Sequence, residues 1–200
     1  MTTIVSIDPG AAYGLAVCVD GTIVYSGQHK MGPVNRGETA RAAIQTAARY
    51  GAIDLVTVEM PAVLGRASSF ESLAGQWSAV LAWWHAAEAL GLRVCWVNPA
   101  SWRALMIRRV KATLLPHQDV KAMLQLPQAV MTQMALGYGV GNDECSAIWM
   151  ALWAWDNLDA LTPEAMKATK AAKREAKAAK KAKAKDKQLA DAIDLADRVM

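Results

Sequence analysis

The N-terminal part of the chain holds three short runs of strand-forming residues, separated by breaks that are too short for a helix. The runs cover residues 3–7, 14–19 and 22–28. The breaks contain Asp8-Pro9-Gly10 and Asp20-Gly21, which are residue types that favour turns. Parallel neighbours need a crossover of a dozen or more residues, so breaks this short join antiparallel strands. The sequence therefore predicts an antiparallel meander of three strands.

Beyond the meander, helical and strand-forming segments alternate. Two predicted helices end just before Gly51 and Gly91, which are good residues for a helix end. A meander followed by this alternation predicts an α/β fold with a mixed five-stranded sheet flanked by helices. The predicted elements are a helix over 38–50, a strand over 54–59, a helix over 68–90, a strand over 93–98, and helices starting near Ser101, within 115–126 and over 143–158.

The excess positive charge of the chain lies in one C-terminal segment. Residues 1–162 hold 11 Lys and Arg against 12 Asp and Glu, whereas residues 163–187 hold 10 against 3. Thr162-Pro163 is a good helix start, and lysines then recur every three or four residues along one helical face. We predict a domain over 1–160 and a lysine-rich helical tail over 161–200. Lys170, Lys173 and Lys177 are its candidate contacts to a polyanion such as nucleic acid.

Composition predicts the cellular location of the protein and the redox state of its cysteines. No apolar run approaches the roughly 20 residues that cross a bilayer, so we expect a protein that does not bind membranes. We also expect it to be located in the cytoplasm. Cys18, Cys95 and Cys145 are widely separated and lack the spacing of a zinc site. We therefore expect all three thiols to be reduced and buried.

Three carboxylates stand where backbone geometry would expose them. Asp8 and Glu59 each end a predicted strand, and Asp143 opens a predicted helix. Each position has an ordinary structural explanation, since Asp favours turns and helix N-caps. If the three cluster, they repel one another and need a cation, and their hard oxygen atoms favour Mg²⁺ or Mn²⁺. Two such ions would suit phosphodiester hydrolysis.

Five short motifs resemble, in order and spacing, those of RuvC-type Holliday junction resolvases. The resemblance covers roughly residues 4–155. The motifs are Ile7-Asp8-Pro9-Gly10 with Gly14, Val58-Glu59-Met60-Pro61, Leu73-Ala74-Gly75-Gln76, Val97-Asn98-Pro99-Ala100-Ser101-Trp102-Arg103 and Asn142-Asp143-Glu144-Cys145-Ser146-Ala147.

This resemblance implies a ribonuclease H-like fold and a homodimer that makes paired nicks in four-way DNA junctions with Mg²⁺ or Mn²⁺. Asp8, Glu59 and Asp143 match the first three metal-binding acids of the family. A compact resolvase with a polybasic end suits a phage or mobile-element enzyme acting in the host cytoplasm.

The sequence departs from the family pattern at two places. The family's fourth acid corresponds to Ser146, a poor metal ligand. Either Glu144 replaces it as a catalytic and metal-binding residue, or three acids suffice, or activity is weakened or lost. The family also carries an aromatic residue after the second acid, whereas here Met60-Pro61-Ala62 follow. Strict selectivity for junctions is therefore an open question.

Basic residues are sparse in the predicted domain. Arg103, Arg108, Arg109 and Lys111 follow the fifth strand, in the region that contacts the DNA backbone in the family. They are candidate substrate-binding residues, and a solvated surface is the alternative. Lys111 and Lys121 are also candidates for lysines near the active site, Lys121 with a catalytic role. Arg66 is a further candidate contact to phosphate.

The sequence thus predicts a metal-dependent endonuclease that cuts DNA at four-way or other branched junctions. Two rival functions stay open. A non-cleaving relative that only binds branched DNA would explain Ser146 and the basic tail. A sugar-kinase or actin-like ATPase would also open on a strand, an Asp and a glycine-rich turn. It would however need a glycine-rich nucleotide-binding element after Asp143, which the sequence lacks.

Overall fold

The structure is a computed structural model. It describes residues 1–10, 12–32, 34–61, 70–113, 122, 125–137, 139–162, 164–165, 167–169, 171–172 and 174–179. Within these residues no helix has the length and apolar character needed to cross a membrane.

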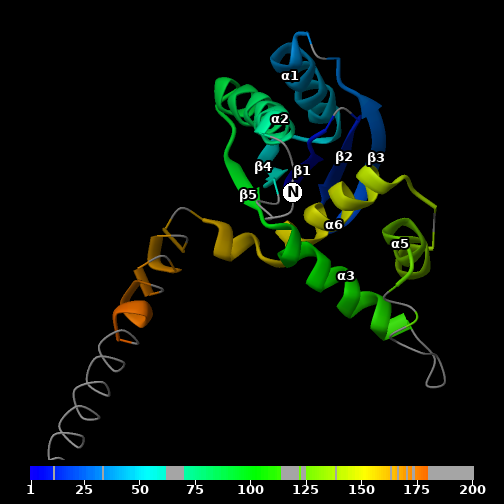
Figure 1. Ribbon diagram of the computed structural model, residues 1–200, viewed down its shortest axis with the longest axis vertical. Helices are drawn as coiled ribbons and strands as arrows, with labels where there is room; N and C mark the ends of the chain where they lie inside the picture. Colours follow the sequence, from blue (N-terminus) through cyan, green and yellow to red (C-terminus); the bar gives the residue numbers. More distant parts are fainter. Residues whose placement is uncertain are drawn as a thin grey trace, which may run out of the picture. The chain divides into compact units, whose positions relative to one another are not determined.

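Five strands form one mixed sheet, as the sequence predicts (Figure 1). The sheet order is β3-β2-β1-β4-β5. The first three strands are antiparallel neighbours, whereas β4 runs parallel to both β1 and β5. The meander therefore forms one half of the sheet and the parallel strands form the other. The strands are β1 (Thr3–Asp8), β2 (Ala12–Val19), β3 (Thr22–Lys30), β4 (Ile53–Glu59) and β5 (Val94–Val97).

The turn between β2 and β3 shows why this part of the fold is readable from sequence. Asp20 and Gly21 both have positive φ, at 47° and 81°. Two successive positive φ values define the tight hairpin turn whose twist matches that of the flanking strands. The Trp155 ring lies against Gly21, so a side chain at position 21 would also meet that ring.

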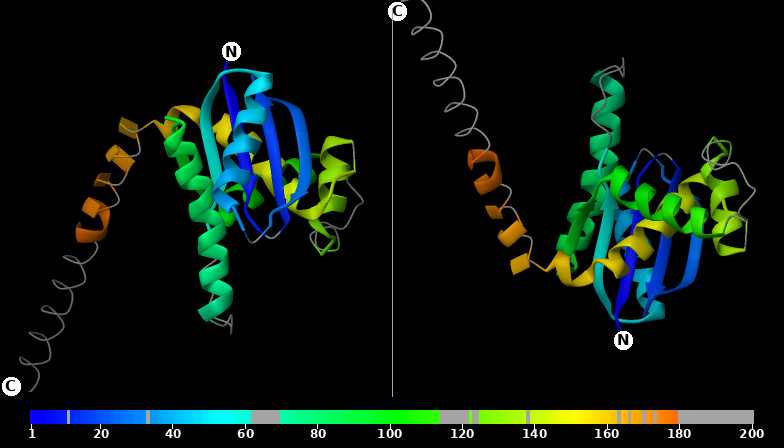
Figure 2. Two further views of the ribbon diagram at one scale, coloured as in Figure 1. Left: turned by 90° about the horizontal axis from the view of Figure 1, so that it is seen from above. Right: turned by 90° about the horizontal axis from the view of Figure 1, so that it is seen from below.

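Helices α1 (Arg36–Ala47) and α2 (Phe70–Ala89) cover one face of the sheet (Figures 1 and 2). Val5 and Ile7 on β1 and Val56 and Val58 on β4 point to this side. They form a single apolar cluster with residues of both helices, including the fully buried Trp83. Burial of alternate strand residues against two helices is the main source of stability of this layer.

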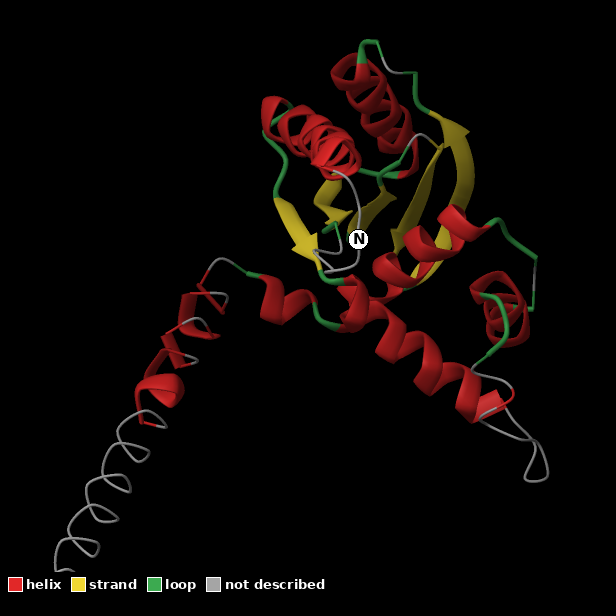
Figure 3. Cartoon of the chain, viewed as in Figure 1, coloured by secondary structure: helices red, strands yellow, loops and turns green. Residues whose placement is uncertain are grey.

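Helix α6 (Asn142–Asp156) lies across the other face, close to β1 and β2 (Figure 3). Small or polar strand residues such as Ser6, Ala16 and Thr57 lie on this face beside the apolar Ile4 and Leu55, and all five are fully buried. Helices α3 (Pro99–Thr113) and α5 (Gln128–Leu136) pack against the outer side of α6. Because α6 is covered on both sides, it is apolar around most of its circumference.

The structure corrects the predicted boundaries at several places. Strands β2 and β3 extend to Ala12 and Lys30, because their backbone pairing continues past the last strongly apolar residue. Helix α5 was not predicted, since its short sequence has no clear helical period. The helix predicted within 115–126 lies almost entirely outside the described residues.

The chain divides into two compact units, residues Met1–Asn157 and Leu158–Met200. The described residues between 164 and 179 are helical, and Lys177 is exposed. Lys170 and Lys173 lie outside the described residues. The nuclease domain over 1–160 and the basic tail over 161–200 stay predictions. The three cysteines are free and buried, as expected.

Gly14→Ala is expected to destabilise the protein. A Cβ atom at position 14 would overlap the backbone of Asp143 and Glu144, so β2 and α6 would have to separate. Overpacking of this kind lowers the free energy of unfolding by about 1 to 3 kcal/mol. Chemical denaturation with urea measures the change. Gly75→Ala is the matched control, because a Cβ at position 75 meets no atom within 4 Å. An equal loss of stability in both variants would contradict the close contact.

Candidate active site

Three residues from neighbouring strands form a row on the α6 face of the sheet. Asp8 on β1 pairs with Gly14 on β2, and Gly14 pairs with Gln28 on β3. Directly paired residues project to the same face of a sheet. Asp8 and Gln28 therefore flank a position that carries no side chain.

The first turn of α6 fills the space above Gly14. The backbone of Asp143 and Glu144 lies directly over this glycine, where a side chain would clash. Asp143 and Glu144 also interact favourably with the positive end of the helix dipole. The absence of a Cβ on β2 is thus what brings the two acids of α6 down to the level of Asp8.

Asp8 and Glu59 are in direct contact. Parallel pairing of β1 with β4 places the ends of the two strands side by side. Burial, the Glu59 carboxylate and a hydrogen bond with it raise the pKa of Asp8 to about 8, while a hydrogen bond with Ser146 opposes the increase. Asp143 adds a further negative charge nearby. At neutral pH, Asp8 therefore keeps a proton unless a cation takes its place.

Helix α3 contributes a side chain that orients Glu59. Asn98 accepts a hydrogen bond from the Ala100 amide at 2.8 Å, and Pro99 occupies the first helical position. This start places Trp102 within the first turn, where it is fully buried. Its indole N–H donates to Glu59 Oε1 at 3.1 Å. A buried donor of this kind restricts the rotation of the carboxylate.

The Asp8–Glu59 pair opens into a cleft of about 330 Å³. Arg103 also lines it and stacks over the Trp102 ring, with 5.1 Å between the guanidinium carbon and the ring centroid. Gln76 on α2 also lines this cleft. The cleft therefore combines two acids with one cation and is bordered by residues from two helices.

The two acids of α6 bind to strand β3. Gln28 Nε2 donates to Asp143 Oδ2 at 2.9 Å, and Ser26 Oγ donates to Glu144 Oε1 at 2.6 Å. The other oxygen of Glu144 accepts a hydrogen bond from the Gly141 amide at 3.3 Å, and this contact caps the N-terminus of the helix. Both carboxylates are half-buried. The prediction that Glu144 is a catalytic, metal-binding acid stays a prediction.

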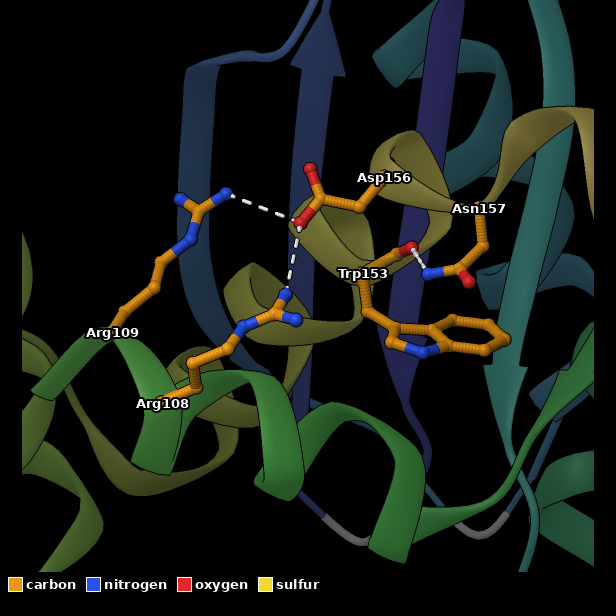
Figure 4. A network of polar contacts seen from close by, with 5 residues as sticks. All are labelled: Arg108, Arg109, Trp153, Asp156 and Asn157. Atoms are coloured by element: carbon orange, nitrogen blue, oxygen red, sulfur yellow. Dashed lines mark hydrogen bonds and ion pairs between the residues drawn. The ribbon is translucent and has the colours of Figure 1, made fainter. Parts of the chain in front are cut away.

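Two of the predicted substrate-binding arginines lie at the far end of α6 (Figure 4). Arg109 and Arg108 approach Asp156 Oδ2 at 3.4 and 3.9 Å. Thirteen residues separate Asp143 from Asp156, which corresponds to about 20 Å along a helix. These cations therefore neutralise the C-terminal end of α6 rather than the acids at its start. Their contact with DNA stays a prediction.

The other predicted basic residues are only partly placed. Lys111 is exposed in the last turn of α3. Lys121 and Arg66 lie outside the described residues, as do Lys170 and Lys173. Of the predicted substrate-binding residues that the structure describes, Arg103 is the one that lines the cleft beside Asp8 and Glu59.

The acids of the site fit a divalent cation in their chemistry. Within the described part of the chain, no Lys or Arg forms an ion pair with any of the four acids, Asp8, Glu59, Asp143 and Glu144. Their oxygen atoms are the ligands that Mg²⁺ and Mn²⁺ prefer. In the same part of the chain, however, no three His, Cys, Asp or Glu side chains are grouped closely enough to hold one ion together. Asp8 and Glu59 form the contact pair, and Asp143 stands apart on Gln28.

Sequence reasoning missed the residues that hold the acids. Ser26 and Gln28 were read only as part of a strand, and Trp102 only as part of a motif. The available signal is the spacing of two polar residues at i and i+2 of one strand, which places both on one face. Which face this is depends on the pairing register, and the sequence leaves that register open.

Comparison with known proteins shows the fold. No protein-family model and no curated protein matches the sequence. The structure is similar to Thermus thermophilus RuvC bound to a Holliday junction substrate, with a TM-score of 0.55, 19% identity, and coverage of 81% of this chain and 98% of that one. A second T. thermophilus RuvC structure has a TM-score of 0.50 and 20% identity, and the match covers 79% of this chain and 96% of that one. The chain therefore has a RuvC-like, ribonuclease H-like fold.

Asp8→Asn is expected to remove a loss of stability that metal-free protein shows as pH rises from about 4 to about 8. Asp8 ionises near 3.8 when unperturbed and at about 8 in the folded chain. Between these values the folded state holds a proton that the unfolded chain has lost, so the free energy of unfolding falls as pH rises. Asparagine cannot ionise. The advantage of the variant should therefore grow from about pH 4 to about pH 8, as thermal melts in EDTA would measure.

Asp159→Asn, which removes an exposed carboxylate, is the matched control. It should follow the pH profile of the parent chain. If the Asp8→Asn and parent profiles run parallel over the whole range, the buried and protonated state of Asp8 is ruled out.

Proposed function

We propose that this chain is a metal-dependent endonuclease that hydrolyses DNA phosphodiesters at branched sites such as four-way junctions. The observation that carries the proposal is the contact pair of Asp8 and Glu59 at the ends of two parallel strands, with Asp143 nearby and Arg103 in the same cleft. Clustered acids beside one cation suit a site that binds both a metal ion and a phosphate.

The choice of branched DNA rests on the solved relative. T. thermophilus RuvC is described in complex with a Holliday junction substrate, and this chain spans almost its whole length. Two symmetric incisions in one junction require two active sites, so the proposal includes a homodimer. The basic tail would add sequence-independent affinity for the DNA backbone through residues such as Lys177.

Asp8, Glu59 and Asp143 are the residues that would hold Mg²⁺ or Mn²⁺. Such an ion activates water and stabilises charge that develops on a phosphate. Two ions are expected from the general chemistry of phosphodiester hydrolysis. The site supports cation binding because Asp8 is buried and bonded to a second carboxylate, an arrangement that is costly when both are ionised.

The protein's own groups would prepare the site for its substrate. Trp102 donates to Glu59 from a fully buried position and fixes one carboxylate oxygen. Arg103 is exposed, lines the cleft, and is stacked on the Trp102 ring, so its guanidinium is available to bind a phosphate. Substrate phosphate would then lie between Arg103 and the acids, as bond hydrolysis at this cleft requires.

Metal-dependent cutting of a four-way junction is the direct test. An end-labelled junction and its linear duplex are incubated with the chain in Mg²⁺, Mn²⁺ or EDTA. We expect nicks at the branch in either metal and none in EDTA, with Asp8→Asn lowering the rate by at least about a thousandfold because the buried ligand is lost. Equal cutting of the duplex would contradict branch selectivity, and cutting in EDTA would contradict the metal site.

Arg103→Ala is expected to weaken binding to junction DNA several-fold without unfolding the protein. An arginine that neutralises one phosphate contributes about one unit to the slope of log K against log salt. A salt titration of binding, followed by fluorescence anisotropy, should show this reduced slope. Arg41→Ala is the matched control, since Arg41 is exposed on α1 and lies outside the cleft. If both variants show the same slope, Arg103 does not bind a phosphate of the junction.

A junction-binding protein that does not cut is the second candidate. The observation that favours it is Ser146, which is buried beside Asp8 at the place of the family's fourth acid. Ser146→Asp separates the two functions. If the parent chain binds junctions without cutting them and the variant gains metal-dependent cutting, the missing acid is the cause.

A further inference from the structure

The start of α6 carries two neighbouring acids, and they have different surroundings. Asp143 has its partner on β3 at Gln28, in the row that contains Asp8. Glu144 has its partner at Ser26, two residues back along the same strand. Both acids are therefore tied to β3, but at different rows of the sheet.

The pairing register shows where these rows lie. Gln28, Gly14 and Asp8 are successive partners across three strands, at the edge that opens into the cleft. Ser26 belongs to the next row inward, with Ala16 and Ser6. Ser6 bonds in turn to the Thr57 hydroxyl on β4, and both of these residues are fully buried. The Ser26 row thus leads under α6, whereas the Gln28 row leads to Asp8.

Both carboxylate oxygens of Glu144 accept hydrogen bonds within the fold. One of its oxygens accepts from Ser26 at 2.6 Å and the other from the Gly141 amide at 3.3 Å. If Glu144 turned toward Asp8, it would leave both the helix cap and the Ser26 hydroxyl, which lies in a different row of the sheet. Each such loss costs about 1 kcal/mol or more.

Asp143 keeps one oxygen available. Its Oδ2 accepts from Gln28, and no contact to Oδ1 occurs among the described residues. Its charge contributes to the raised pKa of Asp8, so Asp143 acts electrostatically on the Asp8–Glu59 pair. Gln28 also packs against Gly141, where a larger residue would meet its side-chain oxygen. The amide of Gln28 is therefore fixed between the helix start and Asp143.

We propose that strand β3 determines which acid of α6 enters the metal site, with Gln28 presenting Asp143 and Ser26 retaining Glu144 as a helix cap. Gln28 is then a positioning residue, and the site has three acids: Asp8, Glu59 and Asp143. This inference rests on the proposed metal-dependent function. The family's fourth acid is missing at Ser146, and the inference excludes one explanation of this, namely that Glu144 replaces it.

The test measures Mn²⁺ affinity by titration calorimetry on the full chain, without DNA. Asp143→Asn and Glu144→Gln change the two acids by the same chemistry. We expect Asp143→Asn to weaken Mn²⁺ binding by at least tenfold, whereas Glu144→Gln should change it by less than about threefold. Glu144→Gln should instead lower the melting temperature, because one cap contact is lost. Equal losses of affinity in both variants would overturn the inference.

Gln28→Ala tests the positioning role with a second readout. It should weaken Mn²⁺ binding by about tenfold at a melting temperature close to that of the parent, since Gln28 is exposed. Gln45→Ala, at an exposed position on α1, is the matched control and should leave the affinity unchanged. Unchanged affinity in Gln28→Ala would overturn the role of Gln28.

The proposed function and this inference fail in different ways. If the parent chain binds no Mn²⁺, or if Asp8→Asn binds it as well as the parent, the metal-dependent function fails and the inference fails with it. If the parent binds Mn²⁺ through Asp8 and Asp143 but Glu144→Gln loses as much affinity as Asp143→Asn, only the inference fails.

Discussion

The close approach of α6 to β2 at Gly14 is the contact on which the rest of the site depends. Packed layers of secondary structure normally lie about 8 to 10 Å apart, with side chains filling the space between them. Here a glycine lets the backbone of Asp143 and Glu144 rest directly on the strand. Small residues such as Ala16 continue this narrow layer inward. The carboxylates of α6 therefore reach the level of Asp8, which a larger side chain at position 14 would prevent.

The two faces of the sheet are lined by different kinds of side chain. The face under α1 and α2 is lined by branched and aromatic side chains and forms the apolar cluster around Trp83. The face under α6 carries buried hydroxyls such as Ser6 and Thr57, which bond to each other. Polar groups can be buried there because each finds a partner. Both faces bury apolar residues, but the face under α6 also buries paired polar groups and carries the acids.

Charge is also divided along α6. Its C-terminal end is neutralised within the protein, because Arg108 and Arg109 approach Asp156. Its N-terminal end brings Asp143 and Glu144 near Asp8, and in the described part of the chain no Lys or Arg pairs with them. This concentration of acids without a basic partner is the basis of the proposed cation site. The sequence leaves open which end of α6 these arginines meet, and their contact with DNA stays a prediction.

The sequence by itself determined the meander, the alternation that follows it, and the strand-end positions of Asp8 and Glu59, since short turns and apolar runs are local properties. It also identified Asp143 as a helix-start acid. Only the tertiary structure decided that Gln28 holds Asp143, that Ser26 holds Glu144 and that Trp102 holds Glu59. These contacts join residues that lie far apart in the chain, and they depend on strand register and helix placement. Both are set by packing of the whole domain, which no local pattern encodes.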